Sequence, residues 1–155
     1  MIFDGDAIKL MPLQSFEAGG VIAEIDSVQW FIPRQDNVHE DAAADVIIVS
    51  GLGSANERCY RMRFWNARFL SFDPYASWFA DGVPELLSKK IPSNEILLGQ
   101  IHKSPLLEWW QSRDTATSNP ALSFDCGHYV ISDGTSLAHV LAFAPPDTEE
   151  VSHAH

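Results

Sequence analysis

The strongest constraint on the fold is a hairpin signal near the C-terminal end of the sequence. Two β-rich runs, His128–Ser132 and Ser136–Phe143, flank Asp133-Gly134, a residue pair that favours the tight turns of β-hairpins. A two-residue turn places His128 directly opposite His139. A four-residue loop shifts the pairing by one step but keeps both histidines on one face. The chain therefore contains an antiparallel sheet.

Four other β-rich runs predict further strands: Val21–Ile25, Val28–Ile32, Val46–Ser50 and Cys59–Phe72. The first two form either a hairpin or one strand bent at Asp26-Ser27. The last is long enough to be the central strand, and its alternation slips near Trp65 and Asn66, which indicates a bulge. Gly51 and Gly53 follow one of these strands, and a turn between two strands explains both glycines better than a nucleotide-binding loop does.

Helices are predicted in the middle of the chain, at Val83–Ser88, from an N-cap at Ser93 through Ile101, and from an N-cap at Ser104 with Pro105 in the first turn. The elements together predict an α+β fold, with a single antiparallel sheet of about five or six strands and two or three helices packed on one face. We expect one domain over residues 1–146. Residues 147–155 are predicted to be an acidic, mobile tail.

The composition fits a single cytoplasmic domain. The chain has 155 residues, of which 46% are hydrophobic, enough to fill the core of one domain. The N-terminus lacks the basic start of a signal peptide, and no apolar run approaches the length that spans a bilayer. Two cysteines are too few for a disulfide framework.

Charge distribution restricts the possible partners. The net charge is −11. Residues 1–57 contribute −8 (ten acids, two bases), residues 58–113 contribute +3 (five acids, eight bases) and residues 114–155 contribute −6 (six acids, no base). Nucleic acid and anionic membrane are disfavoured, because both require a dense basic footprint. A basic protein partner fits this field, and a homo-oligomer is also possible.

An acidic loop after Pro33 is the predicted contact surface for such a partner. It carries Asp36, Glu40, Asp41 and Asp45, and a merely solvated loop is the simpler alternative. A hydrophobic anchor is available in Trp109-Trp110, because neighbouring helical residues point about 100° apart and one of the two can face solvent. We choose Trp110 as the exposed one.

The hairpin register suggests one alternative site. Cys126 joins His128 and His139 on the same face if the strand extends that far. One thiol and two imidazoles could ligate zinc, with a fourth ligand such as His102 supplied from elsewhere. The same face carries Val130, Leu137 and Leu141, so an apolar core is the stronger reading.

No catalytic or cofactor-binding motif is complete in the sequence, so we predict neither an enzyme nor a bound cofactor. The four arginines that follow the glycine turn could bind an anion, but pairing with the surplus carboxylates is the favoured prediction. They are Arg58, Arg61, Arg63 and Arg68.

The size, acidity and aromatic content of the chain, and its lack of catalytic apparatus, resemble those of bacterial immunity proteins, the antidotes to interbacterial toxins. Arg61–Phe72, Ser104–Trp110 and His128–Ala142 have the general look of such proteins. The resemblance implies an inhibitor that covers a cationic toxin domain by steric and electrostatic blocking. The alternatives are a small metal- or thiol-dependent enzyme that uses Cys126, His128 and His139, and a structural or assembly subunit.

Overall fold

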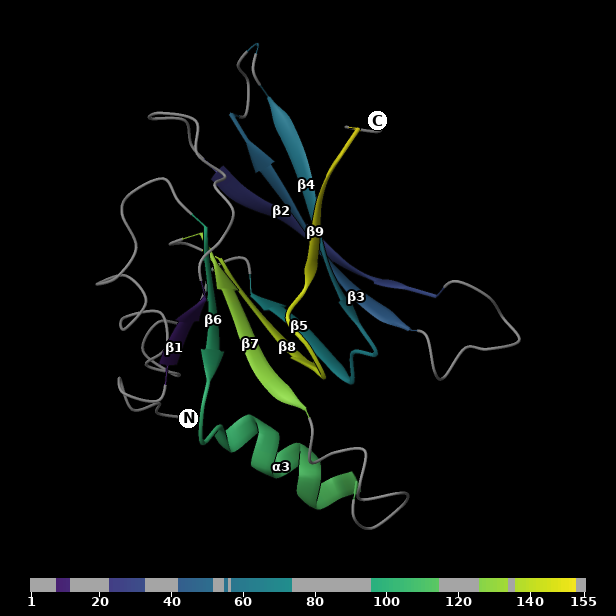
Figure 1. Cartoon of the computed structure of the whole chain (residues 1–155), viewed down its shortest axis with the longest axis vertical. Coiled ribbons are helices and arrows are strands. Elements are labelled where there is room, and N and C mark those ends of the chain that lie inside the picture. The colour runs from purple at the N-terminus through teal and green to yellow at the C-terminus, as the bar shows by residue number, and fades with distance from the viewer. Residues whose placement is uncertain are drawn as a thin grey trace.

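The computed structural model of the chain describes residues 8–11, 23–32, 42–51, 55, 57–73, 96–114, 126–133 and 136–152. The described residues form antiparallel strands and the helix α3 (Pro105–Asp114) (Figure 1). The strands are β1 (Ile8–Met11), β2 (Ala23–Phe31), β3 (Ala43–Ser50), β4 (Arg58–Trp65), β5 (Phe69–Asp73), β6 (Leu97–Ile101), β7 (Gly127–Ser132), β8 (Leu137–Ala142) and β9 (Asp147–Val151). No helix in these ranges is long and apolar enough to cross a membrane.

The strands belong to two sheets, and the prediction of a single sheet with two or three helices on one face is wrong. One sheet has five strands in the order β1-β6-β7-β8-β5, and the other has four in the order β2-β3-β4-β9. The fold of the described residues is therefore mostly β. Local patterns identify strands, but they carry little information about which sheet each strand joins, because pairing is a long-range interaction.

The two sheets meet at a sharp corner after β4. The predicted central strand Cys59–Phe72 is in fact two strands, broken at Asn66, which has a positive φ of 53°. The next two residues then bond to different sheets: the Ala67 N–H donates to the Ala42 carbonyl, beside β3, and the Arg68 N–H donates to the Leu141 carbonyl, in β8. The slip in alternation located this break correctly, but the break is a change of sheet and not a bulge.

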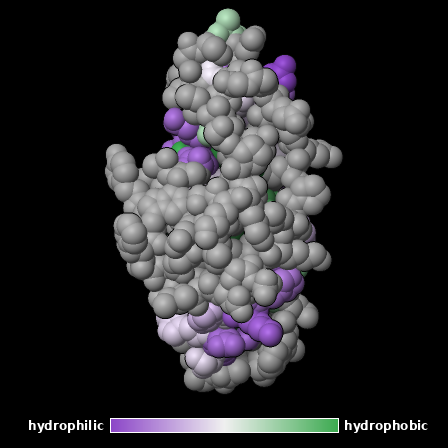
Figure 2. Space-filling model, turned by 90° about the vertical axis from the view of Figure 1, so that its left-hand side faces the viewer, coloured by the Kyte–Doolittle hydropathy of each residue, from purple (hydrophilic) through white to green (hydrophobic). Residues whose placement is uncertain are grey.

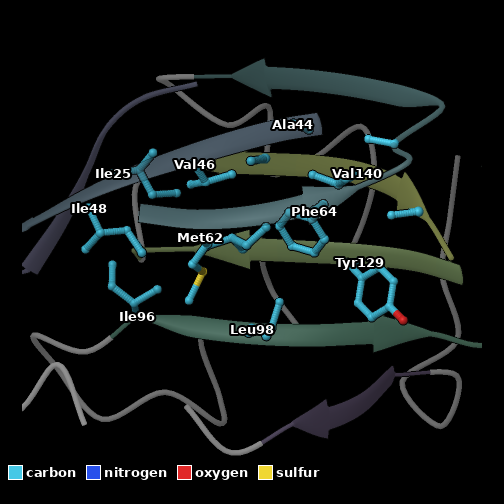
Figure 3. Close-up of a cluster of buried hydrophobic side chains, with 14 of the residues drawn as sticks. Ile25, Ala44, Val46, Ile48, Met62, Phe64, Ile96, Leu98, Tyr129 and Val140 are labelled. Carbon is cyan, nitrogen blue, oxygen red and sulfur yellow. The ribbon is translucent and has the colours of Figure 1, made fainter. Parts of the chain in front are cut away.

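The main core lies between the two sheets (Figure 3). Inward-facing residues of the four-stranded sheet, such as Met62 and Phe64, meet those of the five-stranded sheet, such as Tyr129 and Val140. The Phe64 and Tyr129 rings are 5.5 Å apart, within the range in which aromatic pairs attract. Two sheets packed face to face in this way form a β-sandwich.

The other face of the five-stranded sheet is also apolar. Val130, Leu137 and Leu141 are buried there, as the alternation in the hairpin predicted. Helix α3 contributes to this layer through Trp110, whose ring lies 6.4 Å from that of Phe69. In the face that Figure 2 shows, the described residues at the lower end of the molecule, where α3 lies, are mainly hydrophilic or intermediate.

One of the predicted helices is a strand, and another is confirmed. The segment Leu97–Ile101 forms β6 between β1 and β7, so the helix predicted from Ser93 through Ile101 is wrong over these residues. The few apolar residues of this segment are compatible with both the helical and the strand periodicity. Pairing with β1 on one side and β7 on the other favours the strand. Helix α3 begins as predicted, because Ser104 Oγ accepts the Leu107 N–H at 3.1 Å. The predicted helix at Val83–Ser88 lies outside the described residues.

The N-terminal strands follow the predicted runs with different bounds. The runs around Asp26-Ser27 form the single strand β2, whose register against β3 shifts between Ile25 and Ser27. Strand β3 begins at Ala43, earlier than predicted. Gly51 follows β3 with a φ of 70°, a conformation that favours glycine, so the strand-to-strand turn is confirmed at this residue.

The acidic C-terminal segment differs from the predicted tail. Asp147–Val151 form β9, which pairs with β4 from Cys59↔Val151 to Arg63↔Asp147. Its acidic composition favoured a solvated tail, but β4 carries arginines opposite these carboxylates. Cross-strand attraction between opposite charges stabilises such a pairing.

The loop between β7 and β8 is hydrogen-bonded to the other sheet. It has four residues, because Ser132 pairs with Leu137, and not the two of the tight turn. Asp133 Oδ1 accepts the Ser136 N–H at 2.6 Å. Its second carboxylate oxygen, Oδ2, accepts the Ile25 N–H of β2 at 2.9 Å. One carboxylate therefore holds its own loop and the edge of the other sheet.

We predict that Asp133→Ala destabilises the protein by about 1–3 kcal/mol, because two backbone donors lose a charged acceptor. Chemical denaturation monitored by tryptophan fluorescence measures the loss. Asp26→Ala is the matched control, since the Asp26 side chain is exposed, and it should change stability by less than about 0.5 kcal/mol. Equal effects of the two substitutions would contradict the role of Asp133.

Candidate functional site

Two groups of polar residues are candidates for function. The first is a hydrogen-bonded chain that joins Ser104, His128 and His139. The second lies on the outer face of the four-stranded sheet, which we define as the face turned away from the five-stranded sheet. Each group contains a polar or charged side chain that is fully buried, so each must satisfy that side chain internally.

The histidine chain runs from the first turn of α3 to strand β8. Ser104 Oγ lies 2.6 Å from His128 Nδ1, and His128 Nε2 lies 2.8 Å from His139 Nδ1. The two imidazole rings are 5.1 Å apart. Ser104 thus has two roles, because it also caps the helix. The chain ties α3 to both strands of the β7–β8 hairpin.

The hairpin register explains why the two rings meet. His139 pairs with Val130, and His128 pairs with Leu141, so the histidines are diagonal neighbours on one face. This confirms the shared face predicted from the sequence and selects the four-residue loop. Sequence reasoning identified Ser104 only as a helix cap. Nothing local indicated its contact with a histidine 24 residues away.

Burial keeps the central histidine neutral. His128 is 0% exposed, and its pKa is lowered from 6.5 to about 3, first by desolvation and then by the neighbouring His139. A neutral imidazole has one N–H donor and one acceptor nitrogen. His128 can therefore accept from one neighbour and donate to the other, in either direction along the chain.

This geometry suits a structural link better than catalysis. Ser104 and His128 are both buried, so neither side chain is open to a substrate in this structure. A histidine with a pKa of about 3 is also a poor proton acceptor at neutral pH. Cys126 is buried as well. No group of three or more His, Cys, Asp or Glu among the described residues is placed to hold a metal ion, so the alternative zinc site at Cys126, His128 and His139 has no support here.

The outer face of the four-stranded sheet is arranged in rows across its strands. Phe31, Ala43 and Trp65 form one row, and Gln29, Asp45 and Arg63 form the next. Strand β9 extends the second row with Asp147 and adds Glu149 opposite Arg61. Aromatic, cationic and acidic side chains thus gather at one end of this face.

A buried ion pair is at the centre of these rows. Asp45 is 0% exposed, and both of its carboxylate oxygens accept hydrogen bonds from Arg63, at 2.8 and 2.9 Å. The hydrogen bond to Asp45 raises the pKa of Arg63. The guanidinium carbon lies 3.7 Å from the Phe31 ring centroid and 5.3 Å from that of Trp65, so cation–π attraction adds to the pair.

The other arginines also have internal partners. Arg61 forms an ion pair with Glu149 of β9, and Trp65 Nε1 donates to Asp147 Oδ2 at 3.1 Å. The pKa of Arg58 is raised by a hydrogen bond to Tyr60 and by Glu150. Arg68 lies over the Phe143 ring at 5.4 Å. The prediction of internal pairing is confirmed for Arg61 and Arg63.

The predicted acidic contact surface needs correction at Asp45. This residue belongs to β3 and is buried against Arg63, so it cannot meet a partner. Its place at the end of a polar, acidic segment after Pro33 favoured a loop, and the cross-strand position of Arg63 compensates its burial. Asp36, Glu40 and Asp41 lie outside the described residues.

The predicted aromatic anchor also needs correction. Trp110 packs against Phe69 and is only partly exposed, whereas Trp109 is 46% exposed. One of the two tryptophans is more exposed than the other, as predicted, but the choice of Trp110 as the exposed one is wrong. Among the described residues, three other large apolar side chains are exposed: Trp30 at 46%, Ile32 at 52% and Trp65 at 40%.

Comparisons with protein-family models, curated proteins and solved structures find no match to this chain.

We predict that Arg63→Met destabilises the protein by about 3–5 kcal/mol, because it leaves the buried Asp45 carboxylate without its cation. The control is Arg61→Met on the same strand. Its pair with the exposed Glu149 should contribute less than about 1 kcal/mol. Urea denaturation of the two variants measures both values, and similar losses would contradict the importance of burial at Asp45.

A second prediction concerns pH. Between pH 6.5 and about 3 the unfolded chain binds a proton at His128 that the folded chain does not. The contribution of His128 to the free energy of unfolding is therefore fully present above pH 6.5. As the pH falls from 6.5 towards 3, the free energy of unfolding decreases by up to about 1.4 kcal/mol per pH unit. His128→Gln should flatten the pH dependence of the unfolding free energy in this range. An unchanged slope would show that His128 titrates normally in the folded protein.

Proposed function

We propose that the chain is a protein-binding module that uses the outer face of the four-stranded sheet. The observation that carries this proposal is an aromatic cluster on that face, formed by Trp65 and Phe31 in one cross-strand row, in which Trp65 is exposed. Trp30 pairs with Ala44 and so points to the opposite side of β2, away from this cluster. Exposed tryptophans are favoured anchors at protein interfaces.

The surroundings of Trp65 favour binding because they hold the ring in place. Its indole N–H donates to Asp147, and its ring lies edge-on to Phe31 at 6.1 Å between centroids. Arg63 is held by Asp45 beside the same rings. A side chain that is already ordered loses less conformational entropy when a partner covers it.

The favoured partner is a protein with a cationic surface. The net charge of −11 makes a long-range field that attracts such a partner. Asp147 and Glu149 place exposed carboxylates beside the aromatic cluster. The Asp147 carboxylate accepts the indole N–H of Trp65, so an acid and the exposed aromatic ring lie together.

The more specific form of the proposal is an immunity-type inhibitor of a cationic toxin domain. The class-level resemblance of the sequence and the acidic charge support it. The buried Asp45 makes no contribution to such a surface, so the mechanism relies on the exposed acids of β9 and on the aromatic cluster. Carboxylates would speed the encounter, and Trp65 would slow dissociation.

We predict that Trp65→Ala weakens binding to the partner by about thirty-fold, which corresponds to about 2 kcal/mol for a central anchor. The probe is the purified protein encoded by the neighbouring gene, with a calorimetric or surface-based measurement of the dissociation constant. Trp109→Ala is the matched control, since Trp109 is similarly exposed but lies on α3. It should leave affinity unchanged within about two-fold.

Two results would contradict the proposal at different levels. Equal effects of the two tryptophan substitutions would exclude the outer face as the binding surface. A neighbouring protein that does not bind, or whose binding is not weakened by salt, would exclude the electrostatic inhibitor role.

A further inference from the structure

The two edges of the four-stranded sheet differ in charge. Strands β2 and β9 are the terminal strands of this sheet, and an edge strand offers backbone N–H and C=O groups to any strand that can pair with it. Natural proteins protect such edges with charged side chains, bulges or covering segments. A comparison of the two edges therefore indicates which one is open to pairing.

Strand β9 is protected by charge. Asp147, Glu149 and Glu150 are all exposed along its five residues. Antiparallel pairing with a second copy of β9, centred on Glu149, would place Glu149 opposite itself. Like charges directly opposite one another destabilise a strand pair. Self-association through this edge is therefore opposed.

Among the described residues, the groups that protect strand β2 lie at its N-terminal half. Glu24 and Asp26 are exposed there, the register shifts at Asp26, and the Ile25 N–H is already bonded to Asp133. The C-terminal stretch Ser27–Ile32 contains no charged residue. Gln29, Trp30 and Ile32 are exposed in it, so this part of the edge combines high β-propensity with exposed apolar surface.

We propose that two copies of the chain pair antiparallel along the Ser27–Ile32 stretch of β2, which joins their four-stranded sheets into one continuous sheet. With the two-fold axis at Gln29, each Val28 lies opposite Trp30 of the second copy, and each Ser27 opposite Phe31. Val28 and Trp30 pair with Val46 and Ala44 of β3, so they share the core-facing side of the strand. Because the dimer is symmetric, the contact between Val28 and Trp30 occurs twice, once on each side of the axis.

A second copy fits this edge because the stretch is complementary to itself. In this register no carboxylate faces another across the interface, since Asp26 lies opposite Ile32. The remaining repulsion comes from the net charge of each copy, −11, and salt screens it over about 8 Å at physiological ionic strength. Added salt should therefore strengthen this dimer, whereas it should weaken binding to a cationic partner. The inference is independent of the proposed function.

The experiment introduces a charge at Gln29, which lies on the proposed two-fold axis. Sedimentation velocity of the wild-type chain should show a monomer–dimer equilibrium. Gln29→Lys and Gln29→Glu, at an exposed position, should each raise the dimer dissociation constant about five-fold or more, because the like charges lie opposite or diagonal to each other. An equimolar mixture of the two variants should form a mixed dimer preferentially, as measured by native mass spectrometry. Circular dichroism checks that both variants stay folded.

Thr148→Lys, exposed on the other edge strand, is the matched control and should leave the dissociation constant unchanged within about two-fold. The proposal is overturned if the wild-type chain remains a monomer up to about 0.1 mM. It is also overturned if the wild-type dimer is unaffected by both Gln29 substitutions, or if Thr148→Lys disrupts the dimer as strongly as they do. Preferential formation of the mixed dimer supports pairing at β2.

Discussion

The packing of the two sheets against each other is the interaction on which the rest of the structure depends. Met62 and Phe64 of one sheet face Tyr129 and Val140 of the other across a shared core. The chain reaches both sheets within a few residues, because Asn66 and the two residues after it turn β4 into β5. A short corner of this kind restricts how the two sheets can lie relative to one another.

The buried polar groups are paired in ways that connect separate elements. Asp45 is neutralised by Arg63 from the adjacent strand, and His128 links helix α3 to the hairpin through Ser104 and His139. Asp133 links the hairpin loop to β2 of the other sheet. Each link satisfies a group whose burial without a partner would be costly. The buried Asp45 and His128 and the loop residue Asp133 therefore have a structural role in this fold.

Within the described part of the chain, two features of the four-stranded sheet favour association with another protein. Its outer face presents Trp65 beside exposed carboxylates, and one of its edges, at β2, lacks charge over Ser27–Ile32. The first feature favours a cationic protein partner, and the second favours a second copy of the chain. The two associations differ in their response to salt, because one depends on attraction between unlike charges and the other works against repulsion between like charges.

The sequence by itself determined most of the strands, the N-cap of α3, and the shared face of His128 and His139. These depend on periodicity and on short-range rules, which are visible in a single run of residues. It did not determine the division into two sheets, the strand conformation of Leu97–Ile101, or the place of Asp147–Val151 in a sheet.

Tertiary structure alone decided which residues are available for function. Asp45 reads as a loop carboxylate, but it is buried because Arg63 lies beside it on the neighbouring strand. Trp109 and Trp110 are neighbouring residues of the same type, and Trp110 is the less exposed one, packed against Phe69 of a distant strand. The physical reason is the same in each case: burial and ion pairing are set by residues distant in sequence, and no local pattern records which of them will be neighbours.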